Sequence, residues 1–318
     1  MRKLGMRYVL AICLIGVSAF FISCDNEEVV AHYNRGNAYQ DEGKFNRAIL
    51  AYKKAIEMDA NFAEAHYSLG NTYYRQGQID EAAIAYRNAV RIQPDFVEAR
   101  NGLGLVYRIQ DNDEAAIVEF KEVVNIAPDN PRAHYNLGRT YMDQGKFESA
   151  IVSLEQAIHL NLNSAYAYYY LGNSYKARDK LDQAMAAYKK AIAINPYDAL
   201  SHHNMGISLY NQERFDEAIT HFEAAVRISP RLANLYNNLG KAYKAQDKLD
   251  EAVAAFEKAT SVNPSDARAY YNLGAIYAER GDNGDAMTQY KRALHLARTN
   301  SNLQELIPEI EDRIKALK

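Results

Sequence analysis

The chain has 318 residues, 48% of them apolar, and a formal net charge of -3 at pH 7. This apolar content excludes a disordered chain, and the small net charge excludes a general attraction to nucleic acid or anionic lipid. Both cysteines, Cys13 and Cys24, lie near the N-terminus. The rest of the chain therefore has no residue for a disulfide, a thiolate metal site or a cysteine nucleophile.

The N-terminal segment, residues 1–23, has the layout of a signal peptide, with cations followed by an apolar run over residues 8–22. This run is shorter than the about 20 residues that a membrane-spanning helix requires. Residues 21–24, Phe-Ile-Ser-Cys, resemble a bacterial lipobox, which implies lipidation of Cys24 and a short tether over residues 24–28. An uncleaved membrane anchor and ordinary secretion are the alternatives. We therefore expect an exported protein of the bacterial cell envelope, lipid-anchored in the inner or the outer membrane.

Residues 29–300 contain eight copies of one 34-residue repeat. Glycine recurs every 34 residues from Gly36 to Gly274, and alanine does so from Ala48 to Ala286. Eight of the 16 glycines fall on this one phase, so composition alone cannot explain the spacing. A fixed period of this size is the signature of a stacked repeat architecture. The predicted repeats are 29–62, 63–96, 97–130, 131–164, 165–198, 199–232, 233–266 and 267–300.

Each repeat reads as two amphipathic helices, helix A and helix B. In the second repeat the pattern predicts helix A over 63–76 and helix B over 79–92, with Gly77 in a left-handed turn between them. Gly70 and Ala82 are expected to let the paired helices approach closely. Acidic residues replace the turn glycine in four repeats, at Asp111, Asp179, Glu213 and Asp247.

Both ends of the array depart from the pattern. Arg35 stands in the first repeat where the second has the buried Leu69, as a terminal repeat with one uncovered face permits. Residues 301–318 leave the period but keep helical spacing of their apolar residues, which predicts a C-terminal capping helix over the eighth repeat. Pro308 is expected to begin or kink this helix.

The series of small, aromatic and leucine residues at Leu69, Gly70, Tyr73, Ala82 and Tyr86 resembles the tetratricopeptide repeat. The resemblance implies an all-α fold, a right-handed α-α superhelix or solenoid of eight helix pairs. It also implies that helices A line a concave groove, through positions 2, 5, 6, 9, 12 and 13 of each repeat. A fold of this kind says little about function by itself.

No catalytic or metal-binding motif is present. The sequence lacks a phosphate-binding glycine loop, a GxSxG motif, an HExxH motif and paired CxxC motifs. His32, His66 and His134 share one repeat position, which indicates packing residues rather than metal ligands. His202 and His203 are adjacent, but successive residues of a helix point about 100° apart. We therefore expect no enzyme activity, no metal and no cofactor.

Binding in the groove is the function that remains. Position 6 of the repeat forms a row of asparagines, which Ser68, Gly102 and Tyr170 interrupt. Each asparagine offers donors and an acceptor to the backbone of an extended peptide, and the row resembles the asparagine ladder of O-linked N-acetylglucosamine transferases. The alternative is that asparagine is simply common at this position of the repeat. The asparagine row consists of Asn34, Asn136, Asn204, Asn238 and Asn272.

Aromatic and basic side chains are predicted beside the asparagine row. Rigid aromatic side chains are typical of interface hot spots, and the fifth repeat is expected to present a cluster of them to the groove. Cations at further groove positions are expected to hold an acidic segment or a C-terminal carboxylate, with a solvated charged face as the alternative. The cluster consists of Tyr166, Tyr169 and Tyr170 together with the neighbouring Asn173. The cations are Lys176, Lys241, Lys244 and Arg268.

The sequence as a whole predicts a non-catalytic protein–protein interaction scaffold, tethered to a membrane, that binds peptides or protein segments and assists assembly of an envelope complex. One alternative is a structural element that associates with itself, through Arg35 or the terminal helix. Another is an accessory subunit of a cell-wall or glycan-processing enzyme complex. Nucleic acid is not an expected partner, because the groove positions mix both charges and lack a base-reading code.

Overall fold

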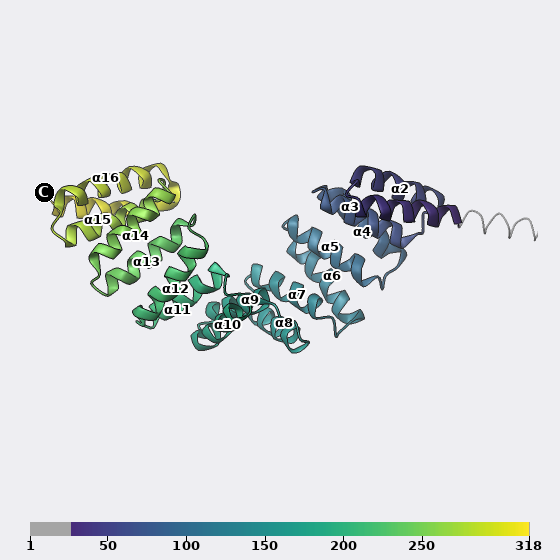
Figure 1. Ribbon diagram of the computed structural model, residues 1–318, viewed down its shortest axis with the longest axis horizontal. Helices are drawn as coiled ribbons and strands as arrows, with labels where there is room; N and C mark the ends of the chain where they lie inside the picture. The colour runs from purple at the N-terminus through teal and green to yellow at the C-terminus, as the bar shows by residue number, and fades with distance from the viewer. Residues whose placement is uncertain (1–26, 318) are drawn as a thin grey trace, which may run out of the picture. The chain divides into compact units, whose positions relative to one another are not determined.

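The computed structural model describes residues 27–317, and within this range all regular structure is helical (Figure 1). The predicted signal peptide, with Cys13 and Cys24, lies outside the described residues. Among the described helices, none is long and apolar enough to cross a membrane. The structure therefore bears on the repeats and on the C-terminal segment.

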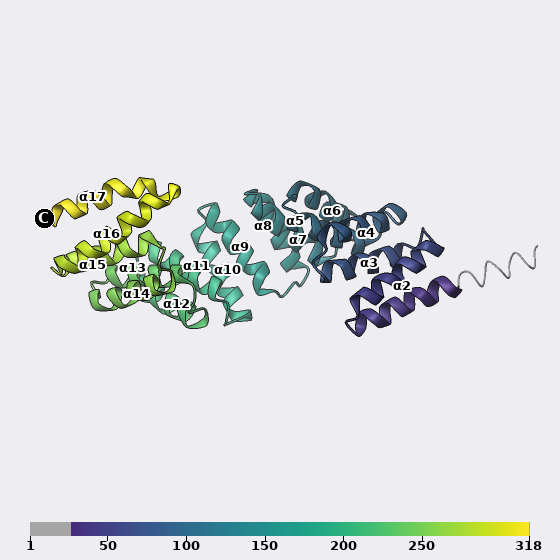
Figure 2. The ribbon, with the colours of Figure 1, turned by 90° about the horizontal axis from the view of Figure 1, so that it is seen from above.

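The helices follow one another in pairs, as the 34-residue period predicts (Figure 1, Figure 2). From the third helix onward, each odd-numbered helix is a helix A and each even-numbered helix is a helix B. The helices are the one at residues 27–41, α2 (Phe45–Met58), α3 (Ala63–Arg75), α4 (Ile79–Ile92), α5 (Val97–Ile109), α6 (Asp113–Ile126), α7 (Pro131–Asp143), α8 (Phe147–His159), α9 (Ala165–Ala177), α10 (Leu181–Ile194), α11 (Ala199–Asn211), α12 (Phe215–Ile228), α13 (Ala233–Ala245), α14 (Leu249–Val262), α15 (Ala267–Glu279) and α16 (Asn283–Thr299).

The chain forms two compact units, an N-terminal unit that ends at Leu162 and a C-terminal unit that begins at Asn163. Within each unit, helix A packs against helix B of the same repeat, and helix B packs against helix A of the next repeat. Helices A also contact one another, α3 with α5 and α5 with α7 in the N-terminal unit, and α11 with α13 in the C-terminal unit. Each unit therefore has a surface made by helices A, which we call the helix A surface.

The core of each repeat forms where a glycine of helix A faces a large side chain of helix B. A Cβ added at Gly70 would lie 2.7 Å from Cδ1 of Tyr86, which is shorter than real carbon contacts allow. Ala82 of helix B is completely buried. The prediction that Gly70 and Ala82 permit close approach of the two helices is confirmed, because any larger residue at these positions would separate the backbones.

The turns between helices A and B adopt the predicted left-handed conformation. Gly77 has φ of 75°, and α3 and α4 end and begin on either side of it, within one residue of the predicted bounds. The acidic residues at the same position also have positive φ, although this conformation costs a residue with a Cβ about 1–2 kcal/mol. Their φ values are 56° at Asp111, 58° at Asp179, 60° at Glu213 and 60° at Asp247.

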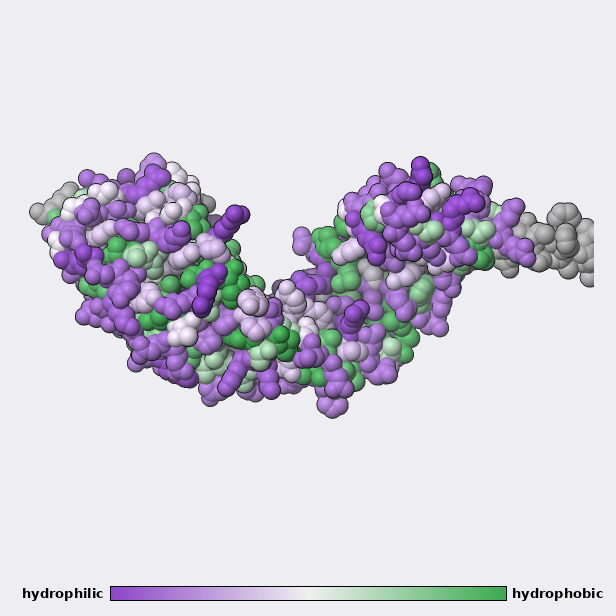
Figure 3. Space-filling model, in the orientation of Figure 1, coloured by the Kyte–Doolittle hydropathy of each residue, from purple (hydrophilic) through white to green (hydrophobic). Residues whose placement is uncertain are grey.

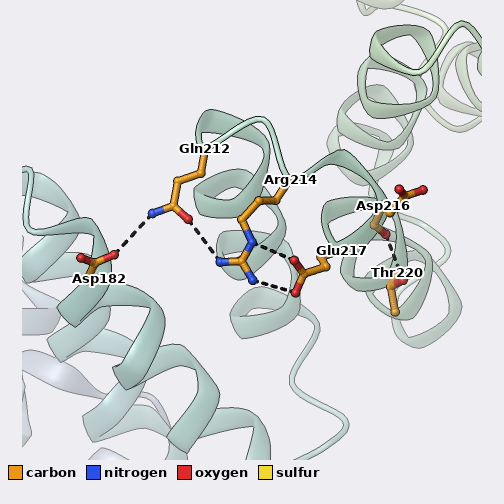
Figure 4. A network of polar contacts seen from close by, with 6 residues as sticks. All are labelled: Asp182, Gln212, Arg214, Asp216, Glu217 and Thr220. Atoms are coloured by element: carbon orange, nitrogen blue, oxygen red, sulfur yellow. Dashed lines mark hydrogen bonds and ion pairs between the residues drawn. The ribbon is translucent and has the colours of Figure 1, made fainter.

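Polar side chains join consecutive repeats near these turns, which the sequence analysis did not foresee. Gln212 Nε2 donates to Asp182 Oδ1 of the preceding repeat at 3.4 Å, and within the sixth repeat Arg214 pairs with Glu217 at 2.7 Å (Figure 4). These groups are exposed, so each pair stabilises the fold only weakly by itself. Equivalent bonds join Gln76 to Asn46, Gln110 to Asp80, Gln144 to Glu114 and Arg280 to Asp250.

The C-terminal cap is built from two segments rather than from the single predicted helix. A 3-10 helix, η1 (Ser301–Leu306), precedes α17 (Ile307–Ala316), and both pack against α16. Pro308 lies in the first turn of α17, where its missing N–H costs nothing because that group has no helical partner. Ile310 is completely buried and belongs to the same apolar cluster as Tyr290.

Candidate functional site

The helix A surface of the N-terminal unit contains a cavity of about 400 Å³. Helices α3, α5 and α7 supply most of its wall, and helix B of the second repeat supplies Tyr86. Its apolar lining combines tyrosine rings with Val97 and Leu105, while amides and two opposite charges complete the rim. The lining residues are Tyr67, Asn71, Tyr74, Tyr86, Val97, Glu98, Asn101, Gly102, Leu105, Asn130, Arg132 and Asn136.

Gly102 explains why the cavity lies at this point of the asparagine row. A Cβ at Gly102 would lie 2.8 Å from the Tyr86 ring, so the glycine leaves space above that ring, which is 2% exposed and belongs to the floor of the cavity. Burial raises the pKa of the Tyr86 hydroxyl, which therefore stays protonated and donates to Asn71 Oδ1 at 2.7 Å. In the sequence, Gly102 stands out only as an interruption of the asparagine row.

Two amides of the cavity have hydrogen-bonding capacity left over. Among the described residues, Asn101 Oδ1 is buried and has no hydrogen-bond partner. An unpaired buried acceptor costs about 1–3 kcal/mol. Asn136, a member of the asparagine row, lines the same cavity and is partly buried. The cavity therefore offers polar groups to a ligand beside an apolar floor. Asn101 was not among the predicted site residues, and it has the same repeat position as the tyrosines of the neighbouring repeats.

In the C-terminal unit, several predicted peptide-binding amides bond to the chain itself. Asn204 is 9% exposed, and its Nδ2 donates to Asn173 Oδ1 at 2.8 Å. Tyr188 donates its hydroxyl proton to the same oxygen at 2.8 Å. Asn238 Nδ2 lies 2.7 Å from His203 Nε2. These groups hold α9, α11 and α13 to one another, so in this structure they stabilise the fold instead of facing an empty groove.

Two of the four predicted groove cations are already paired. Lys244 lies 3.0 Å from a carboxylate oxygen of Glu279, and Arg268 lies 3.6 Å from one of Glu305 in η1. Within residues 27–317, Lys176 and Lys241 have no carboxylate at ion-pair distance. Burial lowers the pKa of the Lys176 ammonium group. Lys244 and Arg268 are thus paired while Lys176 and Lys241 are not, and the binding role of all four cations stays a prediction.

The tyrosine cluster of the fifth repeat is only partly assembled as predicted. The rings of Tyr169 and Tyr170 meet edge to face with centroids 5.3 Å apart, and Tyr169 also lies near Tyr188. Tyr166 is 61% exposed. Tyr169 and Tyr170 thus form one aromatic surface, to which Tyr166 adds an exposed ring on the first turn of α9.

The asparagine row ends differently at its two extremes. Asn34 is exposed on the helix of residues 27–41, and Asn272 is partly buried on α15. Next to Asn272, the Tyr271 hydroxyl donates to Glu309 of α17. The cap therefore covers part of the helix A surface of the eighth repeat, which the sequence analysis did not foresee.

The histidines act as packing and hydrogen-bonding residues. His66 Nε2 and His134 Nε2 lie 3.2 Å and 2.9 Å from carbonyl oxygens six residues earlier, as the predicted packing role requires. His202 makes the same bond, and its Nδ1 lies 3.0 Å from Nδ1 of His221 on α12. The side chain of His203 lies instead beside Asn238 of α13. In the described part of the chain, no group of three or more His, Cys, Asp and Glu residues could hold a metal ion.

His203 makes the fold sensitive to acid. Burial, reinforced by the nearby Lys176 ammonium group, lowers the pKa of His203 to about 4. The unfolded chain takes up this proton near pH 6.5, so the free energy of unfolding falls as the pH drops from there towards 4. Between about pH 7.5 and about pH 5 the expected loss is about 2 kcal/mol.

Urea unfolding of the full chain at the two pH values tests this expectation. His203→Gln keeps a hydrogen-bond acceptor for Asn238 but does not titrate, so its stability should depend about 2 kcal/mol less on pH. The exposed His159→Gln should behave like the unchanged chain. Equal pH dependence in all three proteins would contradict this expectation, because it would mean that folding does not change the pKa of His203.

Comparisons with known proteins find repeat proteins. The sequence matches a family model described as "TPR repeat" over residues 36–77 and 70–108. It also matches a model described as "Cilia and flagella-associated protein 70 C-terminal domain" over residues 96–306. No curated protein matches the sequence.

Three solved structures illustrate the similarity. The APC/C hetero-tetramer Cut9-Hcn1 has a TM-score of 0.57 at 18% identity, covering 84% of this chain and 52% of that chain, so this chain spans about half of it. Pseudomonas aeruginosa pilF has a TM-score of 0.60 at 20% identity, covering 68% of this chain and 97% of that one. YrrB, described as a TPR protein with an unusual peptide-binding site, has a TM-score of 0.52 at 20% identity, covering 59% and 96%. At these identities the likeness shows the fold alone.

Proposed function

Because this chain belongs to the tetratricopeptide repeat family, we propose that it is a non-catalytic scaffold that holds an extended segment of another protein on its helix A surface. Members of this family are in general interaction modules rather than enzymes. The cavity on the helix A surface is lined by apolar and amide groups, and His66, His134, His202 and His221 bond to other groups of the chain.

The cavity between α3, α5 and α7 is the observation that carries this proposal. Its floor, formed by Tyr86 and Leu105, suits an apolar or aromatic side chain of the ligand. The amides of Asn101 and Asn136 lie beside that floor, where a peptide backbone presents N–H and C=O groups. A ligand N–H that donates to Asn101 Oδ1 would remove the free-energy cost of leaving this buried oxygen unpaired. Because only the free protein carries this cost, its removal favours binding. The peptide-binding site named for YrrB supports the same use of the fold.

Selection from a library of random peptides with the purified full chain tests the proposal. We expect enriched peptides that share an apolar or aromatic residue and that compete with one another for the chain. A library that yields no peptide above background, or peptides that bind equally well to the urea-unfolded chain, would contradict the proposal.

The proposed place of action is the bacterial cell envelope, with the chain anchored by lipid on Cys24. The layout of the first 24 residues supports this proposal, and only residues 25–28 then separate the anchor from the first repeat. A scaffold held so close to a membrane would present its bound segment to other envelope proteins. We propose that it assists the assembly of such a complex. An accessory role in a cell-wall or glycan-processing complex is the alternative, distinguished by enzyme activity that appears only when this chain is added.

Mass spectrometry of the mature N-terminus tests the anchor. We expect a chain that begins at an acylated Cys24, because the lipobox-like residues 21–24 direct cleavage before the cysteine. A chain that retains residues 1–23, or one that is cleaved but not acylated, would replace lipid anchoring by a peptide anchor or by secretion.

A further inference from the structure

Helices B of the first four repeats expose a large aliphatic side chain at one shared position. The exposed fractions are 69% at Leu50, 56% at Ile84, 57% at Val118 and 67% at Val152. Single exposed apolar residues are common on proteins. Their recurrence at one position of four consecutive helices, α2, α4, α6 and α8, is not accounted for by chance exposure. We call these four residues the helix B row.

The last four repeats lack this feature. At the same position they have Ala186, Thr220, Ala254 and Thr288. The repeat fold itself therefore does not require an aliphatic residue there. Figure 3 shows a surface on which hydrophilic residues dominate and hydrophobic residues gather in small groups. A row confined to the N-terminal unit indicates an interaction surface.

The helix B row lies beside an apolar recess. A cavity of about 380 Å³ opens between α2 and α4, where Ile56, Leu69, Tyr73 and Ile84 form its apolar wall. It is large enough to accept an aliphatic side chain from a neighbouring molecule. The surface thus carries both protruding aliphatic groups and a recess for them.

In the second and third repeats, charged residues flank the helix B row with opposite signs on its two sides. Residues four before and three after a given residue lie to either side of it along a helix. On the side of the helix N-termini stand exposed carboxylates, and on the other side stand exposed cations. Gln110 and Gln144 bond to these carboxylates but are neutral, so the charges remain. The carboxylates are Asp80 and Glu114, and the cations are Arg87 and Lys121. The first repeat has Asn46 and Lys53 at the two positions, and the fourth has Glu148 and Glu155.

We infer that the helix B row of one molecule packs against the helix B row of a second copy of this chain. A two-fold axis running along the row places the acidic side of one copy against the basic side of the other. Lys121 then faces Glu114 of the second copy, and Arg87 faces Asp80. A two-fold axis across the row would place carboxylates against carboxylates, so the parallel arrangement is favoured.

The same charges argue against a lipid surface as the occupant. Anionic headgroups would be attracted to the cations but repelled by the carboxylates on the other side of the row. A second copy satisfies both sides at once. The parallel arrangement also puts the starts of the two N-terminal units at the same end, so two chains tethered to one membrane can pair.

Sedimentation equilibrium of the full chain in a density-matched detergent tests the inference. The unchanged chain should have twice the mass of one chain at micromolar concentrations. Ile84→Glu with Val118→Glu should raise the dimer dissociation constant at least about 100-fold, because both substitutions place charges in an apolar contact. Ala186→Glu with Ala254→Glu, at the same repeat position in the C-terminal unit, should leave it unchanged. Thermal unfolding should be similar for all, since the four positions are exposed.

A charge exchange tests the orientation. Lys121→Glu alone and Glu114→Lys alone should each weaken the dimer about tenfold, since like charges then meet across the interface. The two substitutions together restore opposite charges and should restore the dimer. A monomer at all concentrations would overturn the inference, and so would a dimer that survives the glutamates at positions 84 and 118. Peptide binding on the helix A surface would be unaffected by either result.

Discussion

Gly172→Val is expected to destabilise the C-terminal unit by about 3 kcal/mol. A Cβ at Gly172 would lie 2.5 Å from Cε1 of Tyr188, and Tyr188 is completely buried. The ring cannot move aside freely, because its hydroxyl is bonded to Asn173. Valine therefore forces α9 and α10 apart, and the apolar contacts along the pair are lost together.

Urea unfolding followed by circular dichroism measures this effect against a matched control. Gly284 lies in a helix, and a Cβ there would meet nothing within 4 Å. Gly284→Val should therefore change the free energy of unfolding by no more than about 0.5 kcal/mol. Because repeats unfold partly independently, the loss at Gly172 should appear in the transition of the C-terminal unit. Similar midpoints for both variants would mean that close helix approach does not depend on glycine.

Asn101→Leu is expected to weaken the binding of a selected peptide by about 10- to 100-fold while leaving the fold as stable or more stable. Leucine has nearly the shape of asparagine but no acceptor, so it removes the unpaired buried oxygen from the free protein. A ligand that donates to this oxygen loses its partner. Stability and affinity should thus move in opposite directions, which general damage to the fold would not produce.

Fluorescence anisotropy of the labelled peptide, with thermal unfolding of the same samples, gives both quantities. Asn125→Leu, on an exposed face of helix B in the same unit, is the control and should bind as the unchanged chain does. Equal affinities for the two variants would place the peptide away from the cavity. A drop in stability for Asn101→Leu would mean that the amide serves the fold.

The helix bounds were predictable because they depend on local features repeated every 34 residues. A turn that needs positive φ selects glycine, aspartate or a related residue whatever lies around it, and Gly77 and Asp111 both adopt this conformation. The capping segment was harder to predict. Its first residues form a 3-10 helix that apolar spacing alone does not distinguish from an α-helix.

The partners of the groove side chains were not predictable from their position in the repeat. Asn204 was expected to face a peptide, but its amide reaches Asn173, 31 residues earlier, because neighbouring helices A lie in contact. A signal for this role was present in the sequence. In three repeats, an asparagine at position 9 is followed 15 residues later by a tyrosine. In each of these repeats the tyrosine hydroxyl donates to the asparagine Oδ1. These pairs are Asn37 with Tyr52, Asn71 with Tyr86 and Asn173 with Tyr188.

The ion pairs of the groove cations were not predictable for a similar reason. Counting cations on one face ignores the carboxylates that the next element brings to them, such as Glu279 for Lys244 and Glu305 for Arg268. The bond between His202 and His221 joins two helices and likewise depends on packing rather than on spacing within one helix.

Photo-crosslinking of a selected peptide tests the central claim most directly. Benzoyl-phenylalanine is placed at position 136, in the cavity of the helix A surface, or at position 125 on helix B, and the full chain is illuminated with the peptide. We expect an adduct from position 136 that maps to one stretch of the peptide and disappears with excess unlabelled peptide, and none from position 125. Adducts formed equally from both positions, or only from position 125, would contradict a scaffold that works through its helix A surface.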